Sequence, residues 1–238
     1  MFRHTVRAKW VAPAFGACAL LWLATGGAAR ASEGAPAPQL VVGDHWQYRV
    51  TDNLRRGALS GLDVEVTAVT NGTARIRLVR TDAGARTEWS DEVDSEGGLT
   101  SGSLNHEAAR PFSPPAQLLS FPLDRGKTWR QTIDVVRADT GLRDQILIVG
   151  RVNGPATTTV PAGRFDTIYV FRTMQLDDAE FWRTRTSRRD SIWYAAAVKA
   201  PVREMRQASY VERGGGRNAP IQTERLLLEL VSFHPGGK

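Results

Sequence analysis

From Leu40 onward, apolar and polar residues alternate along the chain. Trp46, Tyr48 and Val50 take alternate positions with polar residues between them, and the same period of two returns through to Phe233. This period is typical of half-buried strands, and no segment keeps a helical period over three turns. Strands are expected over residues 46–51, 64–68, 74–78, 86–93, 129–135, 144–153, 157–160, 165–176, 180–186, 189–195, 202–210 and 223–233, with a weak strand or turn over 94–103. The pattern predicts an all-β fold with little helix, an antiparallel sheet curved into a barrel or half-barrel, with a sandwich as the alternative.

Two turn motifs join predicted strands. Asn71-Gly72 separates two alternating runs and predicts a tight hairpin. The same residues with Thr73 match a glycosylation acceptor, but the turn explains them without any modification. In Val160-Pro161-Ala162-Gly163, proline fixes the first turn position and glycine can adopt a positive φ. We expect a three-residue loop with a bulge there.

The segment 110–122 contains four prolines around Leu118, Leu119 and Phe121. Proline cannot donate a hydrogen bond to a strand ladder. We therefore expect an irregular crossing segment whose apolar residues pack over one end of the sheet.

The first 31 residues have the features of a cleaved secretory signal. Basic residues precede an apolar run from Val11 to Ala24, and Ala29-Arg30-Ala31 fits a cleavage site before Ser32. A membrane anchor is the alternative, but the run is shorter than the roughly 20 residues that span a bilayer. Cys18 lies inside the run, so a lipoprotein site there is disfavoured. We expect a periplasmic or secreted protein without a transmembrane segment in the mature chain.

Processing changes the charge and the domain plan. Loss of Arg3, Arg7, Lys9 and Arg30 leaves 27 of the 31 basic residues against 25 acidic ones, so the net charge falls from +6 to +2. The basic character of the whole chain is therefore no sign of nucleic-acid binding. Loss of Cys18 leaves no cysteine for a disulfide or a thiolate site. We expect a flexible lead-in over 32–39, a single β domain over 40–234 and a tail over 235–238.

No catalytic or metal-binding motif is complete. His106-Glu107 begins like a zinc-protease motif, but Arg110 stands where the second histidine belongs. His45, beside Asp44, is the least implausible catalytic histidine, yet the pair also suits the turn that starts a strand. We therefore predict no enzyme, no catalytic residue, no cofactor and no metal.

Charged clusters have simple structural interpretations. Asp177, Asp178 and Glu180 could act in acid–base chemistry or bind a cation, but they suit a solvated hairpin tip better. Near them, basic residues (Arg183, Arg185, Arg188 and Arg189) stand beside Phe181 and Trp182. Such a set could bind anionic lipid, a polyanionic partner or nucleic acid. The solvent-facing edge of a strand is the simpler interpretation, and nucleic acid is the least favoured partner.

Most aromatic residues lie in predicted strands. They could line an apolar pocket or fill the core of a barrel, and the two are compatible. They are Trp46, Tyr48, Trp89, Trp129, Phe165, Tyr169, Phe171, Trp193 and Tyr194.

Several short motifs resemble a known family. They are Gly43-Asp44-His45-Trp46-Gln47-Tyr48, Phe121-Pro122-Leu123, Gly126-Lys127-Thr128-Trp129, Val160-Pro161-Ala162-Gly163-Arg164-Phe165-Asp166-Thr167, Ile192-Trp193-Tyr194 and Glu229-Leu230-Val231-Ser232-Phe233. In this order the chain resembles the DUF3108-like group of exported, uncharacterised bacterial proteins. Ala195-Ala196-Ala197 departs from that group, in which a proline or glycine usually follows the Trp-Tyr pair. The resemblance implies a curved antiparallel β fold in the cell envelope and no established activity. By analogy alone, such sheets are similar to lipoprotein carriers that hold acyl chains.

The leading hypothesis is a non-enzymatic periplasmic protein that binds a lipid, another apolar small molecule or an envelope protein. One alternative is a structural or assembly module that acts through an exposed strand edge. Another is a hydrolase that uses His45 or the 177–180 carboxylates.

Overall fold

Strands that follow one another along the chain pair as antiparallel neighbours, except at one place. The computed structural model describes residues 34–104, 109–137, 140–214 and 219–237. Its twelve strands are β1 (His45–Asp52), β2 (Ala58–Thr70), β3 (Thr73–Asp82), β4 (Ala85–Val93), β5 (Leu99–Gly102), β6 (Arg110–Ala116), β7 (Thr128–Val136), β8 (Arg143–Val160), β9 (Gly163–Gln175), β10 (Ser187–Ala195), β11 (Ala200–Tyr210) and β12 (Ile221–His234). In these residues the one helical element is the 3₁₀ turn η1 (Ala196–Val198). The predicted all-β class is confirmed.

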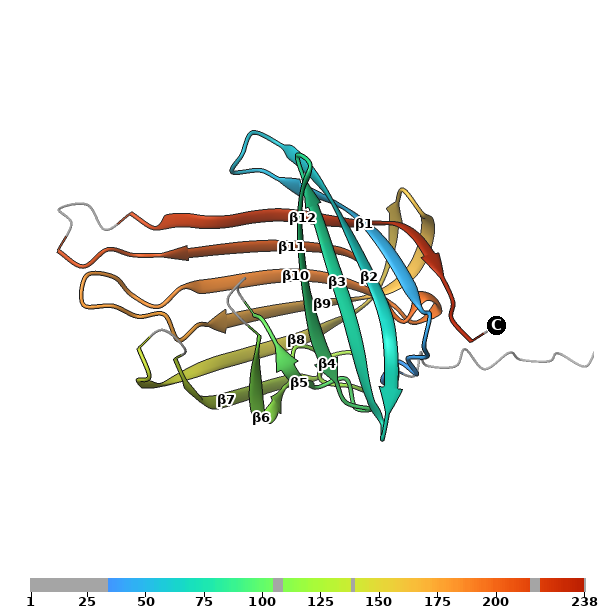
Figure 1. Cartoon of the computed structure of the whole chain (residues 1–238), viewed down its shortest axis with the longest axis horizontal. Helices are drawn as coiled ribbons and strands as arrows, with labels where there is room; N and C mark the ends of the chain where they lie inside the picture. Colours follow the sequence, from blue (N-terminus) through green and yellow to red (C-terminus); the bar gives the residue numbers. More distant parts are fainter. Residues whose placement is uncertain (1–33, 105–108, 138–139, 215–218, 238) are drawn as a thin grey trace, which may run out of the picture. The chain divides into compact units, whose positions relative to one another are not determined.

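A single sheet contains all twelve strands in the order β6-β5-β4-β3-β2-β1-β12-β11-β10-β9-β8-β7. Pairing of β1 with β12 joins two arms, β1–β6 and β7–β12, each made of sequential hairpins. The arms curl toward each other, and Figure 1 shows β6 and β7, the two edge strands, side by side at the foot of the sheet. The sheet is therefore nearly closed into a barrel.

Side chains, not a strand ladder, close the seam between the edges. Gln131 on β7 donates from Nε2 to the Pro115 carbonyl (2.8 Å) and accepts from the Gln117 N–H at the same distance. Trp129 donates its indole N–H to the Gln117 carbonyl at 2.9 Å. We call residues 117–122, which follow β6 and carry this carbonyl, the strap.

The prediction of an irregular proline-rich segment was right for only part of residues 110–122. Residues 117–122 are irregular, but Arg110–Ala116 forms strand β6, so the prediction of an irregular crossing over that part was wrong. The physical reason is the place of this segment at the edge of the sheet. β6 is an edge strand with β5 as its ladder partner, and an edge strand tolerates residues that lack an N–H. Prolines on an edge also discourage pairing with other chains.

The structure confirms the prediction for one of the two turn motifs and corrects the loop length predicted for the other. Asn71 and Gly72 have φ of 50° and 78° and form the predicted hairpin between Thr70 and Thr73. Gly163 adopts a positive φ of 131°, as expected. Val160, however, pairs directly with Gly163, so the loop has two residues, and the predicted three-residue loop was wrong.

The prediction of a strand over residues 180–186, between β9 and β10, was also wrong. Residues 180–186 form no strand apart from isolated bridges, and β10 begins at Ser187. Asp178 explains the irregular path because it accepts the Thr186 N–H (2.6 Å) and hydroxyl (2.5 Å), which folds the segment back on itself.

Apolar clusters fill much of the barrel interior. One lies under β5 and β6 and includes Phe112, Ile133, Ile146, Ile148 and Met174. Others form around Trp46 and Leu230, around Trp129 and Val170, and around Val50 and Leu226. Between them an apolar space remains.

Candidate functional site

An apolar cavity of about 270 Å³ lies inside the curved sheet. Strands of both arms and the strap contribute to its wall. The lining residues are Pro38, Leu40, Trp46, Tyr48, Leu62, Val64, Ile76, Leu78, Val93, Gly97, Leu118, Leu119, Phe121, Tyr194, Lys199, Ala200, Pro201, Glu204, Arg206 and Leu228. Its volume is near the lower end of the range for small-molecule pockets.

Apolar residues at alternate positions of β2 and β3 line one side of the cavity. Leu62 and Val64 come from β2, and Ile76 and Leu78 from β3, and all four are only half-buried. The strap supplies Leu118, Leu119 and Phe121 from another direction. These side chains leave apolar surface uncovered inside the barrel, which a ligand could bury.

Fixed polar groups sit among the apolar ones. The Tyr48 hydroxyl donates to the Pro201 carbonyl (2.9 Å), and the Trp46 indole N–H donates to the Val198 carbonyl (2.7 Å). Burial raises the pKa of Tyr48 far above its usual value, and the nearby Glu204 carboxylate raises it further. Burial likewise raises the pKa of Tyr194 to about 12. Both phenols therefore stay neutral.

Lys199 adds a positive charge to the lining, but it is already paired. Its ammonium lies 2.8 Å from Oδ2 of Asp44, which is fully buried. Burial opposes ionisation of Asp44, but bonds from Lys199 and from the Gly236 and Val41 N–H groups hold its pKa below the usual value. Asp44 thus ties the two ends of the domain together, a structural role that the sequence reading of a simple turn did not foresee.

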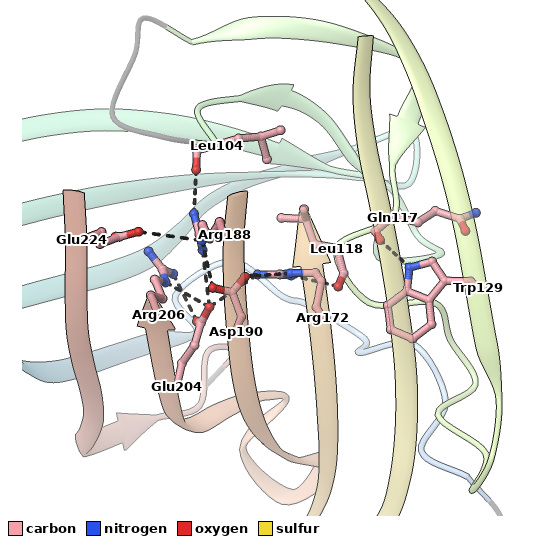
Figure 2. Close-up of polar contacts among 10 residues, drawn as sticks. All are labelled: Leu104, Gln117, Leu118, Trp129, Arg172, Arg188, Asp190, Glu204, Arg206 and Glu224. Carbon is pink, nitrogen blue, oxygen red and sulfur yellow. Dashed lines mark hydrogen bonds and ion pairs between the residues drawn. The ribbon is translucent and has the colours of Figure 1, made fainter. Parts of the chain in front are cut away.

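A cluster of charged residues, all buried except the half-buried Arg206, adjoins the cavity (Figure 2). Arg172 on β9, Asp190 on β10 and Arg206 on β11 stand directly opposite one another in register. Arg188, Glu204 and Glu224 complete the charged cluster. Its three arginines and three carboxylates balance, so the charged cluster is neutral as a whole.

Short contacts hold the charged cluster together. Asp190 accepts from Arg172 Nη2 at 2.6 Å and from Arg188 Nε at 2.9 Å, and its side chain is completely buried. Burial opposes its ionisation, but the two guanidinium groups lower its pKa to about 2. Burial also disfavours the charged form of Arg206, yet Glu204, 2.9 Å from its Nε, raises the pKa of that guanidinium above its usual value. Asp190 and Arg206 are therefore both charged at neutral pH.

The charged cluster also fixes two irregular segments. Arg172 Nη1 donates to the carbonyl of Leu118 in the strap at 2.8 Å. Arg188 Nη1 donates to the Leu104 carbonyl at 2.6 Å. Figure 2 shows both bonds, together with the bond from Trp129 to Gln117. Arg172 thus holds the strap over the cavity and Arg188 holds the segment at Leu104, which assigns both arginines a positioning role.

Asp91 on β4 allows the burial of a carboxyl group to be tested through the pH dependence of stability. Burial raises its pKa from 3.8 to about 6, although the Ser103 N–H and the charge of Arg206 act in the opposite direction. Because the folded chain binds this proton more tightly than the unfolded chain, stability is lost as pH rises from about 4 to 6. We expect Asp91→Asn to raise the free energy of unfolding by about 1–2 kcal/mol at pH 7 and by nearly nothing at pH 4.

Urea unfolding at both pH values measures this difference. Glu88→Gln, which changes an exposed carboxylate on the same strand, is the matched control and should show no such dependence. An equal effect of Asp91→Asn at pH 4 and pH 7 would contradict the raised pKa of the Asp91 carboxyl.

The catalytic candidates from the sequence do not converge. His45 lies 3.4 Å from Asp63 and stacks on His234 at 6.1 Å, and neither His45 nor the 177–180 carboxylates line the cavity. His106 and Glu107 lie outside the described residues, as do the signal peptide, its cleavage site and Cys18. In the part of the chain that the structure describes, no group of three or more possible ligands could hold a metal ion.

Two predictions about the charged residues of this region were wrong: a solvated hairpin tip at 177–180, and a solvent-facing basic edge over 183–189. Asp177 is buried and receives a bidentate pair from Arg110, with contacts of 2.7 and 2.8 Å. Burial opposes ionisation of Asp177, but Arg110 lowers its pKa. Arg188 points into the barrel while Arg189 is exposed. The four arginines are therefore no single surface, because successive residues of a strand face opposite sides.

Sequence reasoning missed the charged cluster, although a signal was present. Glu204 and Arg206 occupy the same alternating positions of β11 as the buried Val202 and Ala208. Charged residues on the apolar side of a strand indicate a buried ion pair, because an unpaired charge is costly there.

The fold and cavity define a nearly closed antiparallel β barrel with an apolar interior site. Three solved structures are similar to it. A candidate lipoprotein from Parabacteroides distasonis has 12% identity over 85% of this chain and 99% of that chain, with a TM-score of 0.44. A candidate exported protein with YmcC-like fold from Bacteroides fragilis has the same identity and coverage, with a TM-score of 0.43. The hypothetical lipoprotein YmcC from Escherichia coli has 9% identity over 82% of this chain and 86% of that chain, with a TM-score of 0.40.

No family model and no curated protein matches the sequence. The resemblance to DUF3108-like proteins thus stays a prediction. Among the described residues, no helix has the length and apolar character needed to cross a membrane.

Proposed function

We propose that this protein is an exported, non-enzymatic binding module that holds an apolar ligand, a single lipid acyl chain, inside the β barrel. The observation that carries the proposal is the cavity of about 270 Å³ with half-buried apolar side chains on β2, β3 and the strap. Burial of those side chains by a ligand provides the driving force, since each buried methylene contributes about 0.8 kcal/mol.

The polar groups of the cavity favour an apolar occupant over a charged one. Lys199 is paired with Asp44, and Arg206 with Glu204, so each positive charge already has its carboxylate. A charged headgroup deep inside would have to displace one of these pairs. These pairs support a binding mode in which the acyl chain occupies the cavity and any headgroup lies toward solvent.

The other hypotheses have less support. A hydrolase would need reactive groups at the cavity, and neither His45 nor the 177–180 carboxylates line it. Assembly through a strand edge would need a free edge, whereas β6 is rich in proline and β7 is bonded through Gln131 and Trp129 to the β6–strap segment. An envelope protein remains a partner to be tested by crosslinking.

Titration with saturated fatty acids of increasing length tests the proposal. Each additional pair of methylenes should tighten binding roughly 15-fold until the cavity is full, after which affinity should level off. Leu78→Trp fills the cavity and should weaken binding at least about tenfold. Leu59→Trp is the matched control, because Leu59 is 63% exposed and does not line the cavity.

Native mass spectrometry of protein recovered from its own periplasm gives an independent readout. It should show an additional lipid-sized mass in the wild type that Leu78→Trp loses. A clean unliganded mass, together with no heat on titration at any chain length, would contradict ligand carriage. Thermal melting of Leu78→Trp separates loss of binding from loss of folding.

A further inference from the structure

Loops of three hairpins meet at one end of the barrel, on the left in Figure 1. They join β7 to β8, β9 to β10 and β11 to β12. Arg137 donates from Nη1 to the Ala179 carbonyl at 2.9 Å, which links the first two loops. The Arg213 N–H donates to the Trp182 carbonyl at 2.7 Å, which links the second to the third.

Large apolar side chains are exposed on two of these linked hairpins. Phe181 is 88% exposed, Leu142 62%, Val136 59% and Trp182 41%. We call these four residues the loop rim. An apolar group that protrudes in this way has no role in the barrel core, and clustered exposure of this kind marks an interaction site.

The loop that carries Phe181 and Trp182 is built by specific contacts. Its three carboxylates are all paired: Asp177 binds Arg110, Asp178 binds Arg183 and Thr186, and Glu180 binds Arg137 at 2.5 Å. The Trp182 ring packs edge-on against Tyr210, with centroids 5.8 Å apart, and the Arg183 guanidinium lies 4.7 Å from the Tyr210 centroid. These contacts fix the loop and the Trp182 ring, and Phe181 beside it is left exposed.

We propose that the loop rim docks this protein on the surface of a lipid bilayer. Tryptophan, tyrosine and arginine together are typical of the membrane–water interface, where an aromatic body is buried and a polar edge stays hydrated. Phe181 supplies a side chain that inserts between lipids. Four side chains at one end of the barrel fall short of the roughly 800 Å² per partner that a standard protein interface buries, but a bilayer needs no such matched surface.

The charges at the rim fit the same partner. Arg143, next to Leu142, and Arg213, bonded to the Trp182 backbone, are both exposed and can contact lipid phosphates. Exposed Glu212 offsets part of this charge. Apolar insertion therefore supplies most of the binding, and anionic lipid strengthens it by a smaller factor.

Sedimentation with lipid vesicles tests the docking proposal, using the processed protein recovered from an exporting host. The wild type should bind phosphatidylcholine vesicles, and severalfold more tightly when phosphatidylglycerol is included. Phe181→Ser should lower the partition coefficient at least about tenfold on both vesicle types. Leu59→Ser removes an exposed apolar side chain away from the rim and should have no effect. Phe181 is so exposed that its replacement should leave the melting temperature unchanged.

Three outcomes would overturn the proposal. The wild type could stay in the supernatant with both vesicle types, or Phe181→Ser could bind as tightly as the wild type. A vesicle-free dimer that Phe181→Ser abolishes would assign the rim to a second copy of the chain instead. Leu78→Trp, which blocks the cavity, should still bind vesicles, so failure of the acyl-chain proposal and failure of docking are distinguishable.

Discussion

Replacement of Asp190 by alanine is expected to lower the free energy of unfolding by about 3–5 kcal/mol. Asp190 is completely buried and accepts bonds from Arg172 and Arg188, which are themselves about 5% exposed. Its removal leaves two guanidinium groups in the interior with a carboxylate missing between them. Breaking one partner of a buried ion pair costs far more than the pair itself contributes.

Urea unfolding measured near pH 7 tests this expectation. Asp166→Ala, which removes an exposed carboxylate from the neighbouring strand β9, is the control and should change stability by less than about 0.5 kcal/mol. A double variant that replaces both Arg172 and Asp190 with apolar residues should recover part of the loss, because an apolar replacement leaves fewer buried charges unmatched. A cost below about 1 kcal/mol for Asp190→Ala would mean that water or movement of the arginines compensates for the lost carboxylate.

Local patterns were sufficient to predict the class of the fold. Alternation in segments such as Trp46–Val50 and the Asn71-Gly72 turn depends on neighbouring residues alone, so these elements could be assigned from sequence. The pairing of β1 with β12 could not, because it joins residues almost 190 positions apart, such as His45 and His234. Closure of the barrel, and with it the cavity, depends on that pairing.

The charged cluster shows why the site was harder to predict than the fold. Arg188 and Arg189 were grouped with Arg183 and Arg185 on one solvent-facing edge, although Arg188 is buried and Arg189 is exposed. In β10, Arg188, Asp190, Ile192 and Tyr194 share the inward face, and all four are buried. The same period of two that predicted the strand would have separated the two arginines. Which carboxylates meet Arg188 is a matter of strand register, which the sequence does not specify.

Cavity residues were predicted in part. Trp46, Tyr48 and Tyr194 were among the aromatics expected to fill a core or line a pocket, and all three line the cavity. Trp129 was in the same group, but it packs at the seam and bonds to the strap. The difference is set by tertiary position: Trp129 lies on the edge strand β7, which only the order of the complete sheet reveals.

Trp129→Ala is expected to lower the free energy of unfolding by about 3–5 kcal/mol, the usual cost of truncating a buried tryptophan. The indole is 9% exposed, and its N–H donates to the Gln117 carbonyl across the seam. Trp129→Phe keeps most of the packing and removes the donor, so a loss of about 1–3 kcal/mol is expected from the unsatisfied carbonyl. Thermal and urea unfolding of the two variants separates packing from hydrogen bonding at the seam.

Gly150 allows a second test of how Trp129 packs at the seam. It stands directly opposite Trp129 in the β7–β8 ladder, and a Cβ at this position would lie 2.1 Å from the indole ring. Gly150→Ala alone should therefore cost about 1–3 kcal/mol, because the ring must move. In the Trp129→Ala background the space is vacant, and the same substitution should cost nothing or stabilise the strand. The two substitutions should thus couple by more than 1 kcal/mol. Strict additivity would mean that the indole does not pack on Gly150, and that the seam is closed by the Gln131 bonds alone.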